Sequence, residues 1–174
     1  MSRSYSNKKK IRTAKRTLLL YCEGADEKAF LNYLKTLFSE GSGVHTTVKE
    51  NHGGCANDVL ENIARQTPAD VMVCVYDTDS GVDQTLKEKA QNRKNICIES
   101  IPCLESFLLN ILENKDYSRH KSCDCKKIFE KNYLDSKKRK DKRNYEKIFP
   151  KSMLVKQSKK IENLKVLIEL ISGK

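Results

Sequence analysis

The apolar run at residues 71–76 constrains the fold of this chain more than any other stretch, because it is continuous and rich in valine. Such a run is typical of a strand that is buried on both faces at the centre of a parallel sheet. It leads directly into Asp77-Thr78-Asp79. The two acidic residues are therefore expected at the carboxyl end of the strand, where open α/β sheets bind their ligands.

Further apolar runs alternate with amphipathic segments on both sides of this strand. The pattern predicts strands at 17–22, 44–48, 71–76 and 95–98, and helices at 25–39, 57–66, 82–94 and 103–113. We expect Asp26 to cap the first helix, and Asn57 or Asp58 to cap the second. The alternation indicates a three-layer, Rossmann-like α/β domain with a mainly parallel sheet over residues 17–113.

The charge of the chain is divided into three parts. Residues 1–16 carry seven Lys or Arg and no acid, residues 17–115 carry nine basic and fifteen acidic residues, and residues 116–174 carry eighteen basic and eight acidic residues. We therefore predict a flexible basic arm at 1–16 and a basic, mostly helical C-terminal extension at 114–174, which ends in an amphipathic helix. An acidic centre between basic flanks suits a metal site that acts on a polyanion.

A dense basic run in the extension is the best candidate for binding nucleic acid, DNA or RNA, through its phosphates. The run consists of Lys137, Lys138, Arg139, Lys140, Lys142 and Arg143. The alternative is that these residues form a solvated segment with no partner.

The remaining composition bears on location and on the cysteines. No apolar run approaches the ~20 residues that cross a bilayer, and the basic N-terminus does not resemble a secretory signal, so a cytoplasmic protein is expected. Seven cysteines are an odd number, and Cys22, Cys74 and Cys97 fall in predicted strands, which favours free thiols. A zinc site using His120, Cys123 and Cys125 lacks a second Cys/His pair at the usual spacing.

Several carboxylates are expected at one edge of the sheet. Asp77 and Asp79 point to the same side of extended backbone, so they repel unless a cation or a proton lies between them. Glu23 follows the first strand, and Glu27 lies one helical turn later. We predict that these four bind Mg²⁺ or Mn²⁺, with Glu23, Asp77 and Asp79 as catalytic residues and Glu105 as an additional ligand.

Each acid also has a simpler interpretation. Glu27 is the kind of first-turn acid that favours a helix dipole, and Glu105 suits a helix start in the same way. Asp77 and Asp79 suit the cap of a turn. Tyr76, beside the acids, is a weak candidate for a covalent nucleophile.

Two segments carry a resemblance to a known family. Glu23-Gly24 with Asp26-Glu27, followed later by Asp77-Thr78-Asp79, resembles the paired acidic motifs of Toprim domains. The segments 21–24 and 100–109 resemble the RloB family over roughly residues 17–113. The chain departs from the family pattern at Ile101, where Asn is usual, at Leu104, where Phe is usual, and at Asp26, where a hydroxyl residue is commoner.

The resemblance implies a Toprim-like fold, dependence on Mg²⁺, and a role in antiphage defence at restriction-modification loci. It also implies kinship with the Toprim nucleases of the overcoming-lysogenization-defect proteins. A partner protein from the same defence locus and a homodimer are further expectations.

Three functional classes stay open at the level of the sequence. The first is a metal-dependent nuclease, and the second is a non-catalytic nucleic-acid-binding module whose acids are structural. The third is a small-molecule phosphotransferase or nucleotide-sugar enzyme that uses Asp77-Thr78-Asp79, although the sequence carries no mark for a nucleotide base or a sugar.

Overall fold

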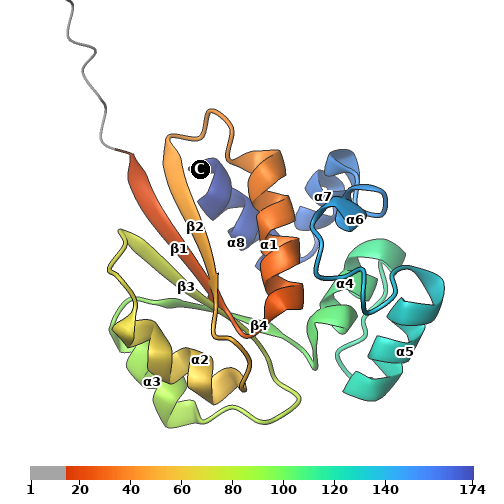
Figure 1. The fold of residues 1–174 in the computed structure, drawn as a ribbon, viewed down its shortest axis with the longest axis horizontal. Helices are drawn as coiled ribbons and strands as arrows, with labels where there is room; N and C mark the ends of the chain where they lie inside the picture. The colour runs from red at the N-terminus through yellow and green to blue at the C-terminus, as the bar shows by residue number, and fades with distance from the viewer. Residues whose placement is uncertain (1–14) are drawn as a thin grey trace, which may run out of the picture.

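The fold is built on a sheet of four parallel strands in the order β2-β1-β3-β4 (Figure 1). It is seen in a computed structural model that describes residues 15–174. The strands are β1 (Arg16–Cys22), β2 (Val44–Glu50), β3 (Val71–Asp77) and β4 (Ile96–Ser100). The predicted α/β fold with a parallel sheet is confirmed, whereas most of the predicted basic arm lies outside the described residues.

The two central strands are buried on both faces, as their continuous apolar runs predict. In β1, Leu18 and Leu20 face one core, and Leu19 and Tyr21 face the other. β3 lies beside β1 with Val73 opposite Leu20, so the carboxyl ends of both strands reach the same edge of the sheet.

Helices cover both faces of the sheet and make three layers (Figure 1). One face is covered by α2 (Ala56–Asn62) and α3 (Gln84–Asn92), with a short 3₁₀ helix, η1 (Ile63–Arg65), after α2. The other is covered by α1 (Ala25–Phe38) and α8 (Glu162–Ser172).

Helices α1 and α2 both begin earlier than the predicted caps, for the same reason. The cap of α1 is Gly24, not Asp26, because the backbone N–H of Gly24 donates to Glu27 at 2.9 Å. The cap of α2 is Cys55, whose N–H donates to Asp58 at 2.8 Å. In each helix a carboxylate at the third position satisfies the N–H of the residue before the helix.

The C-terminal part is helical and shares its core with the sheet. After β4 come α4 (Leu104–Glu113), α5 (Ser122–Asn132), α6 (Arg143–Glu146), α7 (Lys151–Ser158) and α8. Leu164, Leu167 and Ile171 of α8 belong to the same buried cluster as β1 and β3. Residues 114–174 are thus part of the sheet's own packing and not an appendage to it.

Two expectations from the composition concern the whole chain. All seven cysteines are free thiols, as predicted. In the part of the chain that the structure describes, none of the helices is both long and apolar enough to span a membrane.

Candidate active site

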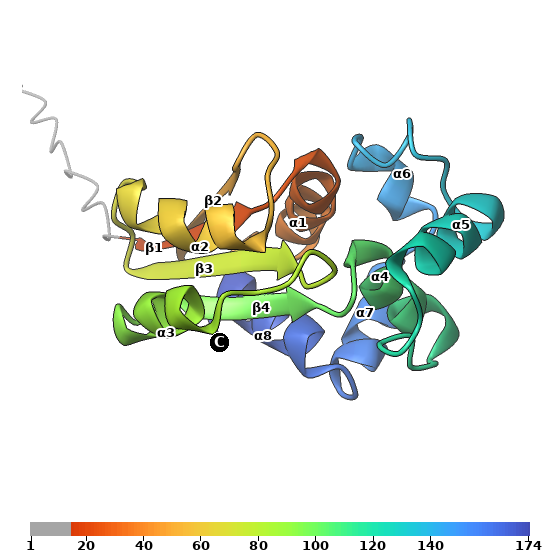
Figure 2. The ribbon, with the colours of Figure 1, turned by 90° about the horizontal axis from the view of Figure 1, so that it is seen from below.

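The carboxyl ends of the strands point toward α4 and α5 (Figure 2). An acidic cavity of about 520 Å³ lies at this edge of the sheet. Its charged lining consists of Glu23, Asp26, Glu27, Glu50, Asp77, Glu105, Lys126, Arg139 and Lys140. Six carboxylates against three cations give the cavity a formal charge of −3. The excess of negative charge favours the binding of a cation or the retention of a proton.

Glu23 and Asp77 meet in this cavity because β1 and β3 are neighbours. The backbone N–H of Asp77 donates to Glu23 Oε2 at 3.3 Å, so the side chain of Glu23 is turned toward β3. Burial, and then the charge of Asp79, raise the pKa of Glu23, while the hydrogen bond from Asp77 opposes that rise. Two of the three predicted catalytic acids are therefore brought together.

Asp77 is the most confined of the predicted catalytic acids. Only 8% of its surface is exposed. Burial, followed by the charges of Glu27 and Glu23, raises the pKa of Asp77 to about 8. At neutral pH and without a cation this carboxyl is therefore mostly protonated, and a bound cation would favour its charged form.

Glu27 both stabilises the start of α1 and lines the cavity. Its Oε2 accepts the N–H of Gly24, as expected for an acid at the start of a helix, and the same side chain lines the cavity. Burial, and then the charges of Glu23 and Asp26, raise its pKa.

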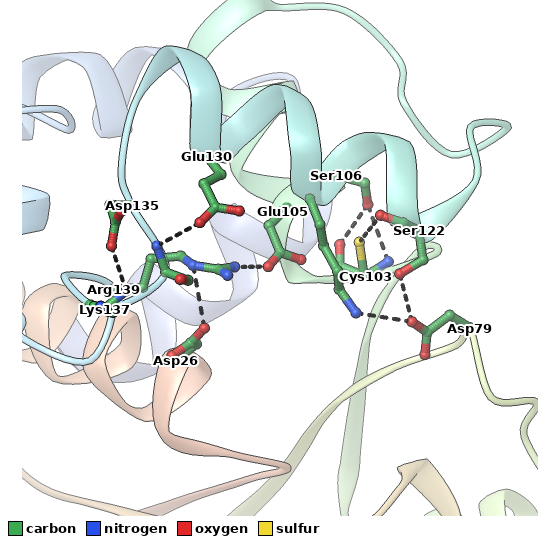
Figure 3. A network of polar contacts seen from close by, with 12 residues as sticks. Asp26, Asp79, Cys103, Glu105, Ser106, Ser122, Glu130, Asp135, Lys137 and Arg139 are labelled. Atoms are coloured by element: carbon green, nitrogen blue, oxygen red, sulfur yellow. Dashed lines mark hydrogen bonds and ion pairs between the residues drawn. The ribbon is translucent and has the colours of Figure 1, made fainter.

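Asp79 lies beside the cavity but is not part of its lining, and α5 holds it in place (Figure 3). Ser122 Oγ donates to Asp79 Oδ2 at 2.7 Å, and Lys126 Nζ lies 3.5 Å from the same oxygen. Ser122 and Lys126 are four residues apart on α5 and so share a face of that helix. Asp79 does not cap the following helix, because Asp83 does.

Glu105 and Arg139 also line the cavity, and they form a buried ion pair with each other (Figure 3). Arg139 is only 8% exposed, and its Nε also lies 3.5 Å from Asp26 Oδ2. The predicted metal ligand Glu105 thus already faces a cation. Arg139 differs from the rest of the predicted basic run, because its charge is used inside the protein.

Several polar atoms of this cavity are buried without a hydrogen-bond partner. Among the described residues, seven side-chain atoms are in this condition, and four of them belong to residues that line the cavity. They are Asp26 Oδ1, Asp77 Oδ1, Glu105 Oε2 and Arg139 Nε. Buried polar groups are normally satisfied, so this concentration marks a place suited to a polar ligand or an ion.

The donor chemistry fits a hard divalent cation. Carboxylate oxygens are the ligands that Mg²⁺ and Mn²⁺ prefer, and Asp77 has an oxygen with no other partner among residues 15–174. As the side chains stand, however, no three His, Cys, Asp or Glu residues in the described chain form a group that encloses a metal ion. This applies equally to the carboxylates here and to His120, Cys123 and Cys125.

Other predicted residues lie elsewhere. Tyr76 is fully buried on the α2–α3 face, where its hydroxyl donates to Glu99 at 3.0 Å, so it does not reach the cavity. The basic run lies in the loop after α5 and ends at the first residue of α6, and all of its members except Arg139 are exposed. Of the exposed members, Lys140 also lines the acidic cavity.

Sequence reasoning did not find four residues of this site: Asp26 as an ion-pair partner, Glu50, Ser122 and Lys126. The sequence shows that Ser122 and Lys126 are spaced i, i+4, but no local sequence pattern predicts that this pair contacts Asp79. Asp26 was assigned to a helix cap, and Glu50 falls at the end of a strand that was predicted two residues too short.

Fold and site together define a three-layer α/β protein with a parallel sheet and an acidic cavity at its carboxyl edge. No protein-family model, curated protein or solved structure matches the chain.

Proposed function

We propose that this protein is a divalent-metal-dependent nuclease of the Toprim-like type, which hydrolyses phosphodiesters of nucleic acid in antiphage defence. The class of enzyme and its role in defence rest on the RloB resemblance of segments 21–24 and 100–109. The proposed metal-dependent hydrolysis is supported by the acidic cavity.

One observation carries the proposal. The buried Asp77 carboxyl lies against Glu23 and Glu27 in a cavity of charge −3, and its Oδ1 has no partner in the described part of the chain. A carboxyl kept in this state destabilises the folded protein. Such strain is typical of functional sites, where a ligand relieves it.

The residues take the following roles in this proposal. A bound Mg²⁺ or Mn²⁺ would supply Lewis acidity toward the scissile phosphate. Asp77 and Glu27 would hold the ion, while Glu23, the more exposed of the three, would take the proton of the attacking water. Asp79 would be a further ligand once its contacts with Ser122 and Lys126 of α5 were broken.

A second candidate function is a non-catalytic nucleic-acid-binding module. It is favoured by the internal partners of two predicted ligands, since Asp79 is bound to α5 and Glu105 to Arg139. In that case the acids hold helices together, and the exposed basic run alone contacts the nucleic acid.

Cleavage assays separate the two functions. Wild-type protein with Mg²⁺ or Mn²⁺ is expected to cut labelled DNA or RNA, and the removal of an essential ligand in Asp77→Asn is expected to lower the rate by about 100-fold or more. Asp70→Asn is the matched control, because Asp70 lies just before the opposite end of β3 and, among residues 15–174, its side chain bonds only to Thr17. Retention of full cleavage in Asp77→Asn would contradict the proposal. Metal-independent binding without cleavage would support the second function.

A further inference from the structure

A second open cavity, of about 550 Å³, adjoins the acidic one, and we call it the basic groove. It lies between α1 and the loop before α6. Its lining is Ala25, Lys28, Ala29, Asn32, Glu50, Lys140, Asp141, Lys142 and Arg143. The two cavities share Ala25, Glu50 and Lys140, so they are joined side by side.

The sign of the charge changes from one cavity to the next. Four cations and two carboxylates line the basic groove, which gives it a formal charge of +2 beside the −3 of the acidic cavity. Lys28 pairs with Glu50 at 2.9 Å, and Arg143 pairs with Asp141 at 2.6 Å. Within residues 15–174, Lys140 and Lys142 have no carboxylate partner, so their charges are available to an anion.

The loop before α6 and helix α1 come close together beside the groove. Lys142 comes from the loop and reaches across to α1, where its Nζ donates to Thr36 Oγ1 at 3.0 Å. Thr36 lies on α1 beside the residues that line the groove, so at this end of the groove the loop and α1 are within the reach of one lysine side chain. A B-form duplex is wider than ~12 Å, the width of its major groove, whereas a lysine side chain is shorter than that. The loop and α1 are therefore too close together at this point to hold a duplex between them.

The groove lining also indicates which part of a nucleic acid it suits. The nine residues that line it include no aromatic side chain, so the described groove offers no surface on which bases stack. Lysines, an arginine and an asparagine amide are instead groups that contact phosphate and sugar.

We propose that the basic groove binds the phosphate backbone of a single nucleic-acid strand and directs it to the carboxylates of the adjoining cavity, with Lys140 between the two. This inference rests on the proposed function and adds its substrate class, which is single-stranded nucleic acid bound with little base preference. It also assigns a contact surface on α1, at Lys28 and Asn32, which the sequence did not indicate.

The test measures binding of wild-type protein in EDTA, which prevents metal-dependent cleavage, by fluorescence anisotropy at several salt concentrations. The probes are labelled single-stranded DNA, single-stranded RNA and a duplex of the same length. Lys140→Gln/Lys142→Gln is expected to weaken single-strand binding about 10-fold or more. It should also reduce the slope of log K against log salt by about 1.4, the value for two phosphate contacts on a single strand.

Asn32→Asp places a negative charge on the α1 wall of the groove and is expected to weaken binding in the same way. Each variant has a control with the same chemical change outside both cavities. The controls are Lys156→Gln/Lys159→Gln on and just after α7, and Asn92→Asp in α3.

The outcomes are distinguishable. If the groove variants bind no more weakly than their controls, or if the duplex binds more tightly than the single strand, this inference is wrong, while cleavage by the wild type still supports the proposed function. If the wild type binds single strands through the groove but cuts nothing with Mn²⁺, the assignment of the groove as a single-strand binding surface stands, whereas the delivery of a substrate to the carboxylates and the nuclease are refuted. Absence of both binding and cleavage overturns both.

Discussion

Asp77 links stability to pH through its burial beside two other acids. Its pKa is about 8 in the folded protein and 3.8 for an unperturbed side chain, so between these values the folded state binds more protons than the unfolded state. The free energy of unfolding is therefore expected to fall as the pH rises through this window.

Asp77→Asn should remove this cost without changing the shape of the side chain. In EDTA, we expect the variant to be more stable than wild type at pH 8.5 by roughly 1 to 2 kcal/mol, or about 2 to 8 °C in Tm, and to differ little at pH 5. Urea denaturation at both pH values checks this. An equal effect at both pH values would show that ionisation of Asp77 is not the cause.

Arg139 illustrates how a residue in a basic run becomes internal. Its ion pair with Glu105 is buried, and removal of one partner leaves a buried charge. Arg139→Met is therefore expected to cost about 3–5 kcal/mol of unfolding free energy, and Arg139→Met/Glu105→Gln should recover much of it. Lys138→Met, at an exposed neighbour, should stay within about 0.5 kcal/mol. An Arg139→Met variant as stable as Lys138→Met would contradict the pairing.

At the scale of the element, α8 is the helix whose role the sequence left open. Its apolar periodicity predicted an amphipathic helix, but not that the buried face lies on the sheet. Leu167 is 1% exposed in the main core, so Leu167→Ala is expected to cost about 2–5 kcal/mol. Val155 in α7 is 42% exposed, and Val155→Ala should change stability by less than about 0.5 kcal/mol. Thermal or urea unfolding measures both variants. If Leu167→Ala and Val155→Ala lowered the free energy of unfolding by similar amounts, this role for α8 would be refuted.

The sequence predicted strands and long helices well because their signals are local. A buried strand shows itself as an apolar run, and β1 and β3 fall where those runs lie. Helices α6 and α7 were missed because their buried residues, Tyr145 and Leu154, are isolated in a strongly charged stretch. They become core only through contact with distant elements such as α1.

The site, like the fold, was predictable where its residues follow from local sequence patterns. Glu23, Glu27 and Asp77 follow from strand ends and one helical turn, and the structure brings them together. The partners of Asp79 and Glu105 come from α5 and the loop after it, and no local pattern records a contact over such a separation.

At the scale of the whole molecule, the charges are sorted into an acidic cavity and a basic groove despite a net charge of +11. A divalent cation that binds the acidic cavity should stabilise the folded protein. Mn²⁺ at about 100 times its Kd should add roughly 2.7 kcal/mol to the free energy of unfolding. Thermal unfolding with Mn²⁺ and with EDTA measures this. The gain should be largely lost in Asp77→Asn, and an equal gain in that variant would place the ion elsewhere.

The position of α8 against α1 and β2 has a consequence for how the protein is made. While the ribosome synthesises the chain, the strands emerge before the helix that completes their cover. Part of one apolar face of the nascent sheet thus stays exposed until residues 162–172 have left the exit tunnel. Chaperones that act on nascent chains are expected to bind this face during that interval.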